Sequence, residues 1–295
     1  MAAGSEPAAR LCDPAGALLG EGPVWHEREQ ALYWVDIKGR QLHCYRPADG
    51  SARHWAMHDR LAWVSPRRAG GFVAGFAHEI GILQLEPQLS FTPRMIIEPD
   101  RPGNRLNDAK TDRDGSLWFG SMDDNETSPS GAFYHLRPDF SLAMADTGYT
   151  IANGPALAPD GRTIYHTDSA ARTIYRYARL QDGALAPRTP FIHFTEADGF
   201  PDGMTVDAQG GLWVAHWGGG RVSRFTAEGL LDRAFSLPVS QVTSCCFGGE
   251  QLDRLFVTTA AIGLSEAQRL REPLAGALFE LTPGVNGLPC PDFAG

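Results

Sequence analysis

Three short segments of the sequence place an oxygen-bearing side chain directly before a glycine: Glu21-Gly-Pro-Val-Trp, Asn153-Gly-Pro-Ala-Leu and Asp202-Gly-Met-Thr-Val. Two carboxylates and an amide oxygen are ligands that a hard divalent cation prefers. Asp-Gly and Asn-Gly pairs often only make turns, but Glu has no special turn propensity, so a turn does not account for Glu21. If the fold brings these three side chains together, we expect them to bind a divalent metal ion.

The elements that would position these side chains recur six times. Each copy is a turn followed by a short strand rich in aromatic and β-branched residues: ALYWVDI, GGFVAGF, GSLWFGSM, RTIYHTD, GGLWVAHW and DRLFVTT. Aligned on one aromatic residue in each, the copies follow at steps of 39, 46, 47, 48 and 43 residues, which suits four strands per repeat. We therefore predict an all-β fold, a six-bladed β-propeller with a central metal-binding channel.

This propeller is expected to be a single domain over residues 1–295, with its repeats over about 20–284. Short antiparallel hairpins follow from the alternation of apolar strands with Asp-Gly turns. Helical periodicity is poor, and residues 264–270 are the only stretch where we expect a helical turn.

The segment just before each aligned strand is the expected innermost strand of its blade, which lines the channel. Glu21 and Asn153 stand 12 residues, and Asp202 11 residues, before the aligned aromatic residue, so the three occupy equivalent positions in three blades. In the third blade Arg105 and Asn107 lie at the corresponding place, where a guanidinium and an amide could hold a polyhydroxylated ligand. A polar loop is the alternative for these two residues.

Charged residues at the ends of the second strands have a different expected role. Asp36, Asp168 and His216 should lie at the same end of the propeller as the three candidate ligands, but farther from the axis. We interpret them as residues that support turns or orient the ligands.

Composition narrows the range of functions. The formal net charge is -9, and no basic run is longer than Arg67-Arg68, which argues against nucleic acid and anionic membrane as partners. The first residues lack a signal-peptide pattern and no apolar window is long enough for a spanning helix, so we expect a cytoplasmic protein. The five cysteines have no CxxC spacing, and we expect Cys245 and Cys246 to be ordinary buried residues.

Four longer segments resemble the SMP-30/gluconolactonase/regucalcin family: GEGPVW, RLNDAKTDRDGSLWFGSM, IANGPALAPDGRTIYHTD and FPDGMTVDAQGGLWVAHWGG. The resemblance runs from about residue 20 to about residue 283. It implies a six-bladed propeller with one divalent metal bound by a Glu, an Asn and an Asp, which match Glu21, Asn153 and Asp202.

The resemblance also implies a substrate site. The family's substrate-binding Arg and Asn match Arg105 and Asn107. A third contact, acidic in the animal members, falls near Asn125 here, with Asp123 and Asp124 just before it. Bacterial members typically open gluconolactone, xylonolactone, arabinonolactone or similar rings to the free acid.

We therefore expect a hydrolase that opens a sugar lactone with metal-activated water. The metal would be Ca²⁺, Zn²⁺, Mn²⁺, Mg²⁺ or Fe²⁺, and Asp202 would serve both as a ligand and as the acceptor of the water's proton. The expected partner is the small-molecule lactone, and the protein is expected to be a monomer or a weak homo-oligomer.

Three other interpretations remain open at this point. The same site could hold calcium or a sugar acid without turnover, as in a regucalcin-type binding protein. A WD40-type scaffold would carry GH and WD signatures that the repeats lack. A paraoxonase-like esterase would be expected to carry an apolar N-terminal helix, which this sequence does not show.

Overall fold

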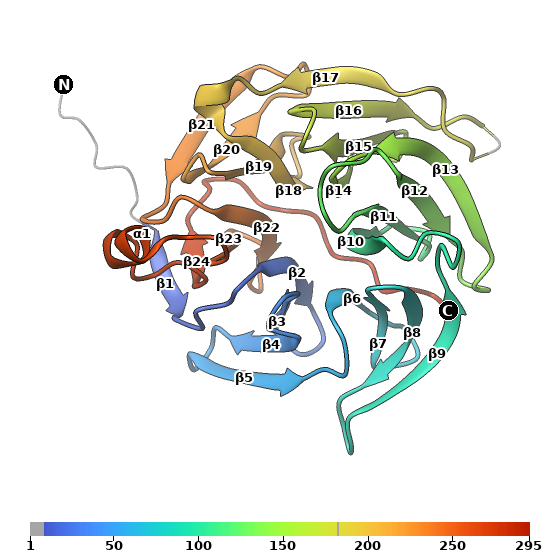
Figure 1. The fold of residues 1–295 in the computed structure, drawn as a ribbon, viewed down its shortest axis with the longest axis horizontal. Coiled ribbons are helices and arrows are strands. Elements are labelled where there is room, and N and C mark those ends of the chain that lie inside the picture. The colour runs from blue at the N-terminus through green and yellow to red at the C-terminus, as the bar shows by residue number, and fades with distance from the viewer. Residues whose placement is uncertain (1–8, 182) are drawn as a thin grey trace.

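The computed structural model describes residues 9–181 and 183–295. Within these ranges the strands form six antiparallel sheets of four strands each, arranged as blades around a central axis (Figure 1). The predicted all-β, six-bladed propeller is thereby confirmed. In each blade an innermost strand lies at the axis and the outermost strand lies at the rim.

The first three blades follow one another along the chain. Blade 1 consists of β2 (Gly20–His26), β3 (Ala31–Asp36), β4 (Gln41–Arg46) and β5 (Ser51–Ala56). Blade 2 consists of β6 (Leu61–Pro66), β7 (Phe72–Phe76), β8 (Glu79–Gln84) and β9 (Ser90–Ile96). Blade 3 consists of β10 (Asn104–Thr111), β11 (Leu117–Asp123), β12 (Gly131–Leu136) and β13 (Leu142–Tyr149).

The second half of the ring repeats this arrangement. Blade 4 consists of β14 (Ala152–Leu157), β15 (Thr163–Asp168), β16 (Thr173–Ala178) and β17 (Thr189–His193). Blade 5 consists of β18 (Phe200–Val206), β19 (Leu212–Trp217), β20 (Arg221–Phe225) and β21 (Leu231–Ser236). Blade 6 contains β22 (Val242–Gly248), β23 (Arg254–Thr259) and β24 (Leu278–Leu281), with β1 (Arg10–Asp13) as its outermost strand.

The ring is closed by strands from opposite parts of the sequence. β1 pairs with β24, with Arg10 opposite Glu280. Arg10 and Arg254 both form ion pairs with Glu280, so the closing strand is held by charge as well as by the sheet. The repeat pattern, which begins near residue 20, did not reveal this strand.

Between neighbouring blades lies a core of interlocking apolar side chains. The six aromatic residues that aligned the repeats are all buried: Tyr33, Phe72, Trp118, Tyr165, Trp213 and Phe256. Those of blades 1 and 2 touch directly, since the ring centroids of Tyr33 and Phe72 lie 4.8 Å apart. The aromatic residue of each repeat therefore holds one blade against its neighbours.

Two short helices interrupt the sheets. The α-helix α1 (Glu266–Arg271) follows β23 and lies close to the predicted helical turn at 264–270. The 3-10 helix η1 (Glu196–Asp198) precedes β18. Among the described residues, neither helix has the length and apolar character that crossing a bilayer requires.

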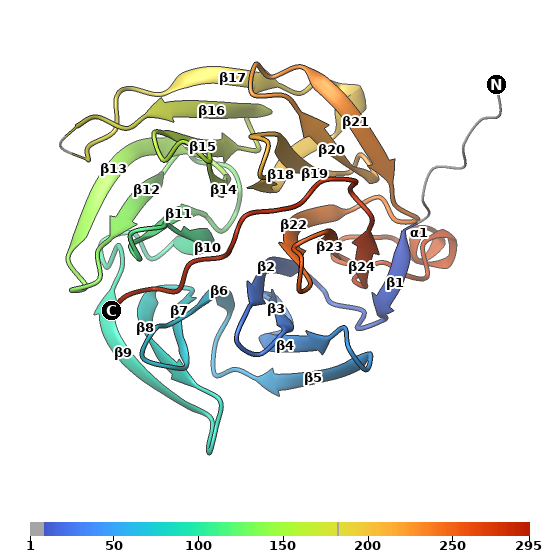
Figure 2. The same cartoon turned by 180° about the vertical axis from the view of Figure 1, so that it is seen from behind.

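After β24 the chain crosses one end face of the ring (Figure 2). It bonds to blade 2 on the far side, where the Phe293 N–H donates to the Pro66 carbonyl at 2.8 Å. The Phe293 side chain is fully buried in the core between blades 2 and 3. One end of the propeller is thus covered by the C-terminal segment.

Candidate metal and substrate site

The glycines that follow the candidate ligands produce irregularities in the innermost strands. The pairing of β2 with β3 shifts register between Glu21 and Val24, and that of β14 with β15 shifts between Asn153 and Ala156. A β-bulge of this kind re-aims a side chain. Gly22 has φ 51 and Gly154 has φ 72, left-handed values that glycine adopts at little cost. The Glu-Gly-Pro and Asn-Gly-Pro sequences are therefore the bulges that direct Glu21 and Asn153 to the axis.

Asp202 is positioned in the same way. The pairing of β18 with β19 shifts register between Pro201 and Met204. The glycine after Asp202 is needed for space, because a Cβ on Gly203 would lie 2.2 Å from the Ser244 Oγ of the next inner strand. A larger residue here would push blades 5 and 6 apart.

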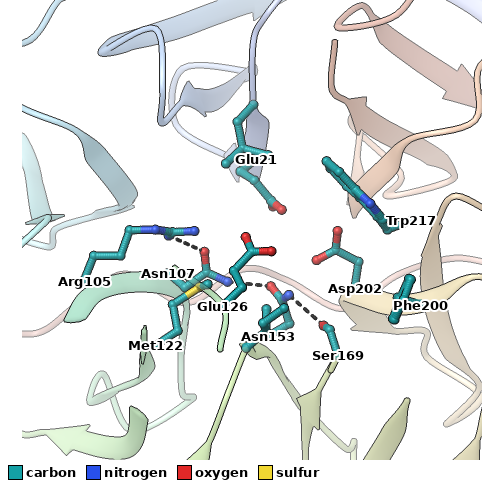
Figure 3. Close-up of a pocket in the computed structure, with 12 residues that line it drawn as sticks. Glu21, Arg105, Asn107, Met122, Glu126, Asn153, Ser169, Phe200, Asp202 and Trp217 are labelled. Carbon is teal, nitrogen blue, oxygen red and sulfur yellow. Dashed lines mark hydrogen bonds between the residues drawn. The ribbon is translucent and has the colours of Figure 1, made fainter. Parts of the chain in front are cut away.

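The structure brings the three candidate ligands to one cavity at the axis (Figure 3). The cavity has a volume of about 160 Å³. Glu21, Asn153 and Asp202 all line it, and none is more than 5% exposed. Residues from blades 1, 4 and 5 therefore converge as the repeat alignment predicted.

Glu21 and Asp202 lie in surroundings that disfavour the ionised form of a carboxyl group. Burial, and then the nearby charge of Asp108, raises the pKa of Glu21 to about 8. Burial, followed by the charges of Glu21 and Asp108, raises the pKa of Asp202 well above its usual range. Like charges in a low-dielectric site disfavour ionisation in this way. A bound cation would remove this cost.

The donor set fits a hard divalent cation. Asp202 Oδ1 is buried without a hydrogen-bond partner, which is costly for a carboxylate oxygen. Asn153 Oδ1 accepts a hydrogen bond from Asn107 Nδ2 at 2.8 Å, but a carbonyl oxygen keeps a second lone pair. The described residues contain no group of three His, Cys, Asp or Glu side chains that could hold a metal, so the candidate set depends on the amide oxygen of Asn153. The candidate ligands are therefore the carboxylates of Glu21 and Asp202 and the amide oxygen of Asn153.

A chain of hydrogen bonds orients the amides across three blades. Arg105 Nη1 donates to Asn107 Oδ1 at 2.6 Å, and Asn107 donates in turn to Asn153. Asn153 Nδ2 donates to Ser169 Oγ at 3.0 Å, whose hydroxyl donates to the Pro201 carbonyl at 2.6 Å. Arg105 and Asn107 both line the cavity, so the structure places the predicted substrate-binding pair beside the predicted ligands.

Asp124 holds the guanidinium of Arg105. Its carboxylate accepts from Arg105 Nε at 3.0 Å, from Arg60 Nη1 at 2.6 Å and from Lys38 Nζ at 3.1 Å. Burial opposes ionisation of Asp124, but the hydrogen bonds from Arg60 and Lys38 and the charge of Arg105 lower its pKa to about 2. One carboxylate thereby ties blades 1, 2 and 3 together at the edge of the cavity.

Asn125 is not brought to the cavity. Both Asn125 and Glu126 are exposed, but Glu126, and not Asn125, lines the cavity (Figure 3). The turn is fixed by Asp123, whose Oδ2 accepts from the Thr127 N–H at 3.1 Å and the Ser128 N–H at 2.9 Å. Glu126 has φ 60 in this turn, a conformation that the sequence did not signal.

Apolar side chains, called the apolar wall below, also line the cavity next to the candidate ligands (Figure 3), and the sequence analysis missed them. Leu19, Ile151 and Phe200 each stand two residues before Glu21, Asn153 and Asp202, and Trp217 and Met122 complete the wall. Residues two apart on a strand share a face. The signal was therefore present, and the same spacing relates Arg105 to Asn107.

Asp36 and Asp168 support this wall from the ends of the second strands. Asp36 accepts hydrogen bonds from the N–H groups of Leu18 and Leu19, both at 2.9 Å. Asp168 does the same for Thr150 and Ile151, both at 3.2 Å. The predicted turn-supporting role of these two acids agrees with the geometry.

Six blades around a channel whose cavity is lined by oxygen-bearing and apolar side chains define a propeller with an axial site. The family model described as SMP-30/Gluconolactonase/LRE-like region matches residues 19–261. The chain belongs to this family, as its motifs indicated.

Similar proteins include two named lactonases. The chain is 38% identical over 282 residues to the L-arabinolactonase of Azospirillum brasilense, covering 94% of this chain and 92% of that protein. It is 36% identical over 276 residues to a pentonolactonase of Haloferax volcanii, covering 92% and 93%. The solved structure of regucalcin from Agrobacterium tumefaciens, described as a calcium-binding protein, is similar with a TM-score of 0.93 at 28% identity, covering 98% of each chain.

Proposed function

We propose that this protein hydrolyses a sugar lactone to the free sugar acid at the axial cavity, with a divalent metal ion bound by Glu21, Asn153 and Asp202. The observation that carries the proposal is the convergence of two buried carboxylates and an amide on one small cavity, beside polar side chains that suit sugar hydroxyls. Two relatives of similar length are named as lactonases, which supports the reaction type.

The reaction adds the oxygen of water to the acyl carbon and breaks the bond from that carbon to the ring oxygen, which leaves as a hydroxyl. A bound divalent cation supplies polarisation of the carbonyl and lowers the pKa of water. Asp202, with one buried oxygen free of hydrogen bonds, accepts the proton from the attacking water. Glu21 and Asn153 hold the cation in place.

The rest of the cavity orients the ring. Arg105 is fixed by hydrogen bonds from its Nε and Nη1, and its Nη2 can donate to ring hydroxyls without further ordering. Asn107 donates both of its N–H groups to the Ala152 carbonyl and to Asn153 Oδ1, so it can meet a ring hydroxyl only as an acceptor through Oδ1. Glu126 can accept from hydroxyls on the same side. Phe200 and Trp217 face the less polar surface of the sugar, where C–H groups lie. A small polyhydroxylated lactone matches this mixed polar and apolar lining.

A panel of lactones tests the proposal. Purified protein is supplied with gluconolactone, xylonolactone or arabinonolactone, and acid release is followed with a pH indicator, with and without EDTA. We expect turnover of at least one lactone, its loss in EDTA, and its recovery with Mn²⁺, Ca²⁺ or Zn²⁺. Turnover that survives complete metal removal contradicts the metal's role, and no turnover with any metal contradicts the activity.

A binding protein without turnover is the second candidate. It is favoured by the description of the structurally similar regucalcin as calcium-binding. In the same panel, tight calcium binding with no acid release from any lactone would support this candidate over the first.

The neighbours Asn125 and Glu126 provide a matched pair of variants. Glu126→Gln removes a charged acceptor from the cavity and should raise KM by about tenfold, since a hydrogen bond to a charged group contributes about 1.5–3 kcal/mol. Asn125→Ala changes an exposed side chain and should leave kcat/KM within about twofold. Equal effects of the two variants on the KM of the best lactone would contradict this placement.

A further inference from the structure

The C-terminal segment 282–295 covers the end of the channel opposite the candidate site (Figure 2). It contains no helix or strand of its own, yet it bonds to four blades. The Gly287 N–H donates to the Leu252 carbonyl at 2.7 Å, and the Asn286 carbonyl accepts from the Ala208 N–H at 2.9 Å. At its other end, Phe293 bonds to blade 2 and the Ala294 N–H donates to the Gly115 carbonyl at 2.9 Å.

Beneath this segment lies a second cavity, with a volume of about 280 Å³. Cys290 of the segment, Cys246 of β22 and Lys110 of β10 all line it. Cys246 is 3% exposed, whereas Cys290 and Lys110 are half-buried. The two cysteines meet at this cavity although 44 residues separate them, and Gly287 of the segment lies against Phe247, the residue that follows Cys246.

The surroundings favour a reactive thiol at Cys290. The side chain of Cys246 lowers the pKa of Cys290 to about 7; burial opposes this shift, and the charge of Lys110 adds to it. A thiolate beside a lysine is the reactive form of cysteine. Cys245 is not expected to be reactive. Burial raises its pKa to about 12, and its side chain donates to the Trp213 carbonyl.

We propose that Cys246 and Cys290 form an intramolecular disulfide under oxidising conditions, which fastens the C-terminal segment to the innermost strand of blade 6. Both side chains line the same cavity, and the segment that carries Cys290 lacks regular structure and can adjust to the geometry of an S–S bond. Cys246 is buried, as expected from the sequence, and this proposal gives it a role in addition to packing.

A small-molecule disulfide such as oxidised glutathione is the oxidant. The Cys290 thiolate attacks one of its sulfurs, which forms a mixed disulfide and releases one glutathione thiolate. Cys246 then loses its proton to that thiolate and attacks the Cys290 sulfur, which releases the second glutathione. The two cysteines lose two electrons, and one disulfide is reduced to two thiols.

The test uses the full chain incubated with oxidised glutathione or with dithiothreitol. Free thiols are then counted in denaturant, and peptides are mapped by mass spectrometry without reduction. We expect the count to fall from five to three, with the peptides of Cys246 and Cys290 joined. We also expect the thermal midpoint to rise by roughly 5 °C, because a cross-link across a long loop restricts the unfolded chain.

Two variants complete the experiment. Cys290→Ser changes a residue outside the sheets, and it should abolish both the thiol loss and the thermal shift. Cys12→Ser, which changes a half-buried cysteine of β1, should leave both unchanged. Five free thiols after oxidation of the folded protein, a glutathione that stays bound to Cys290, or an unchanged response in Cys290→Ser would each overturn the proposal.

Discussion

Asp202→Asn is expected to lower kcat/KM for the best lactone by about 10²–10⁴-fold, the usual contribution of a positioned proton acceptor. The amide keeps the size of the side chain and an oxygen that can still bind a cation, as Asn153 is proposed to do. It cannot accept a proton from water. The buried, unpartnered Oδ1 of Asp202 also makes a neutral side chain easy to accommodate, so the variant should fold.

Metal content, thermal midpoint and turnover are measured on the same sample of this variant. Glu250→Gln is the matched control, since it also neutralises an acid but lies exposed in the turn after β22, beside the C-terminal segment. Retained metal with lost turnover supports proton acceptance by Asp202. A folded Asp202→Asn protein with near wild-type turnover would refute the assignment.

The repeats explain why the ring, and the convergence of the three candidate ligands on its axis, could be predicted from sequence. An aromatic residue at a regular interval packs each blade on its neighbour, so its spacing shows both the number of blades and where each innermost strand begins. Glu21, Asn153 and Asp202 then fall at equivalent places by the same spacing. Their bulges follow from the glycine after each of them.

Other features depend on loops that no periodicity describes. Whether Asn125 or Glu126 faces the cavity is decided by the hydrogen bonds that Asp123 makes within one turn. β1 joins blade 6 by pairing with a strand more than 260 residues away in the sequence, and nothing in its own residues indicates that partner. The apolar wall, in contrast, could have been predicted, since Leu19 and Phe200 lie two residues before a ligand on the same strand face.

The metal-free protein is expected to be less stable at about pH 8 than at about pH 5, and a divalent cation is expected to restore the loss. The pKa of Glu21 is raised in the folded state from 4.5 to about 8, and that of Asp202 is raised as well. Between these values the folded state holds protons that the unfolded state has released. This contribution to stability is complete below about pH 4.5 and is lost as the pH rises through about 8.

Thermal midpoints are measured in EDTA and in excess Mn²⁺ or Ca²⁺ across this range. The gain from the cation should grow with pH, because the cation replaces protons that are held more weakly as the pH rises. Glu21→Gln is the control. Its residue 21 has no titrating proton, so any change of its thermal midpoint with pH comes from other groups. Between the two pH values, the wild-type protein in EDTA should lose roughly 3–4 kcal/mol more of its free energy of unfolding than this variant. Two outcomes would show that Glu21 is not a buried acid at the proposed metal site. One is an equal loss of stability with pH in the two proteins, and the other is a stabilisation by the cation that does not change with pH.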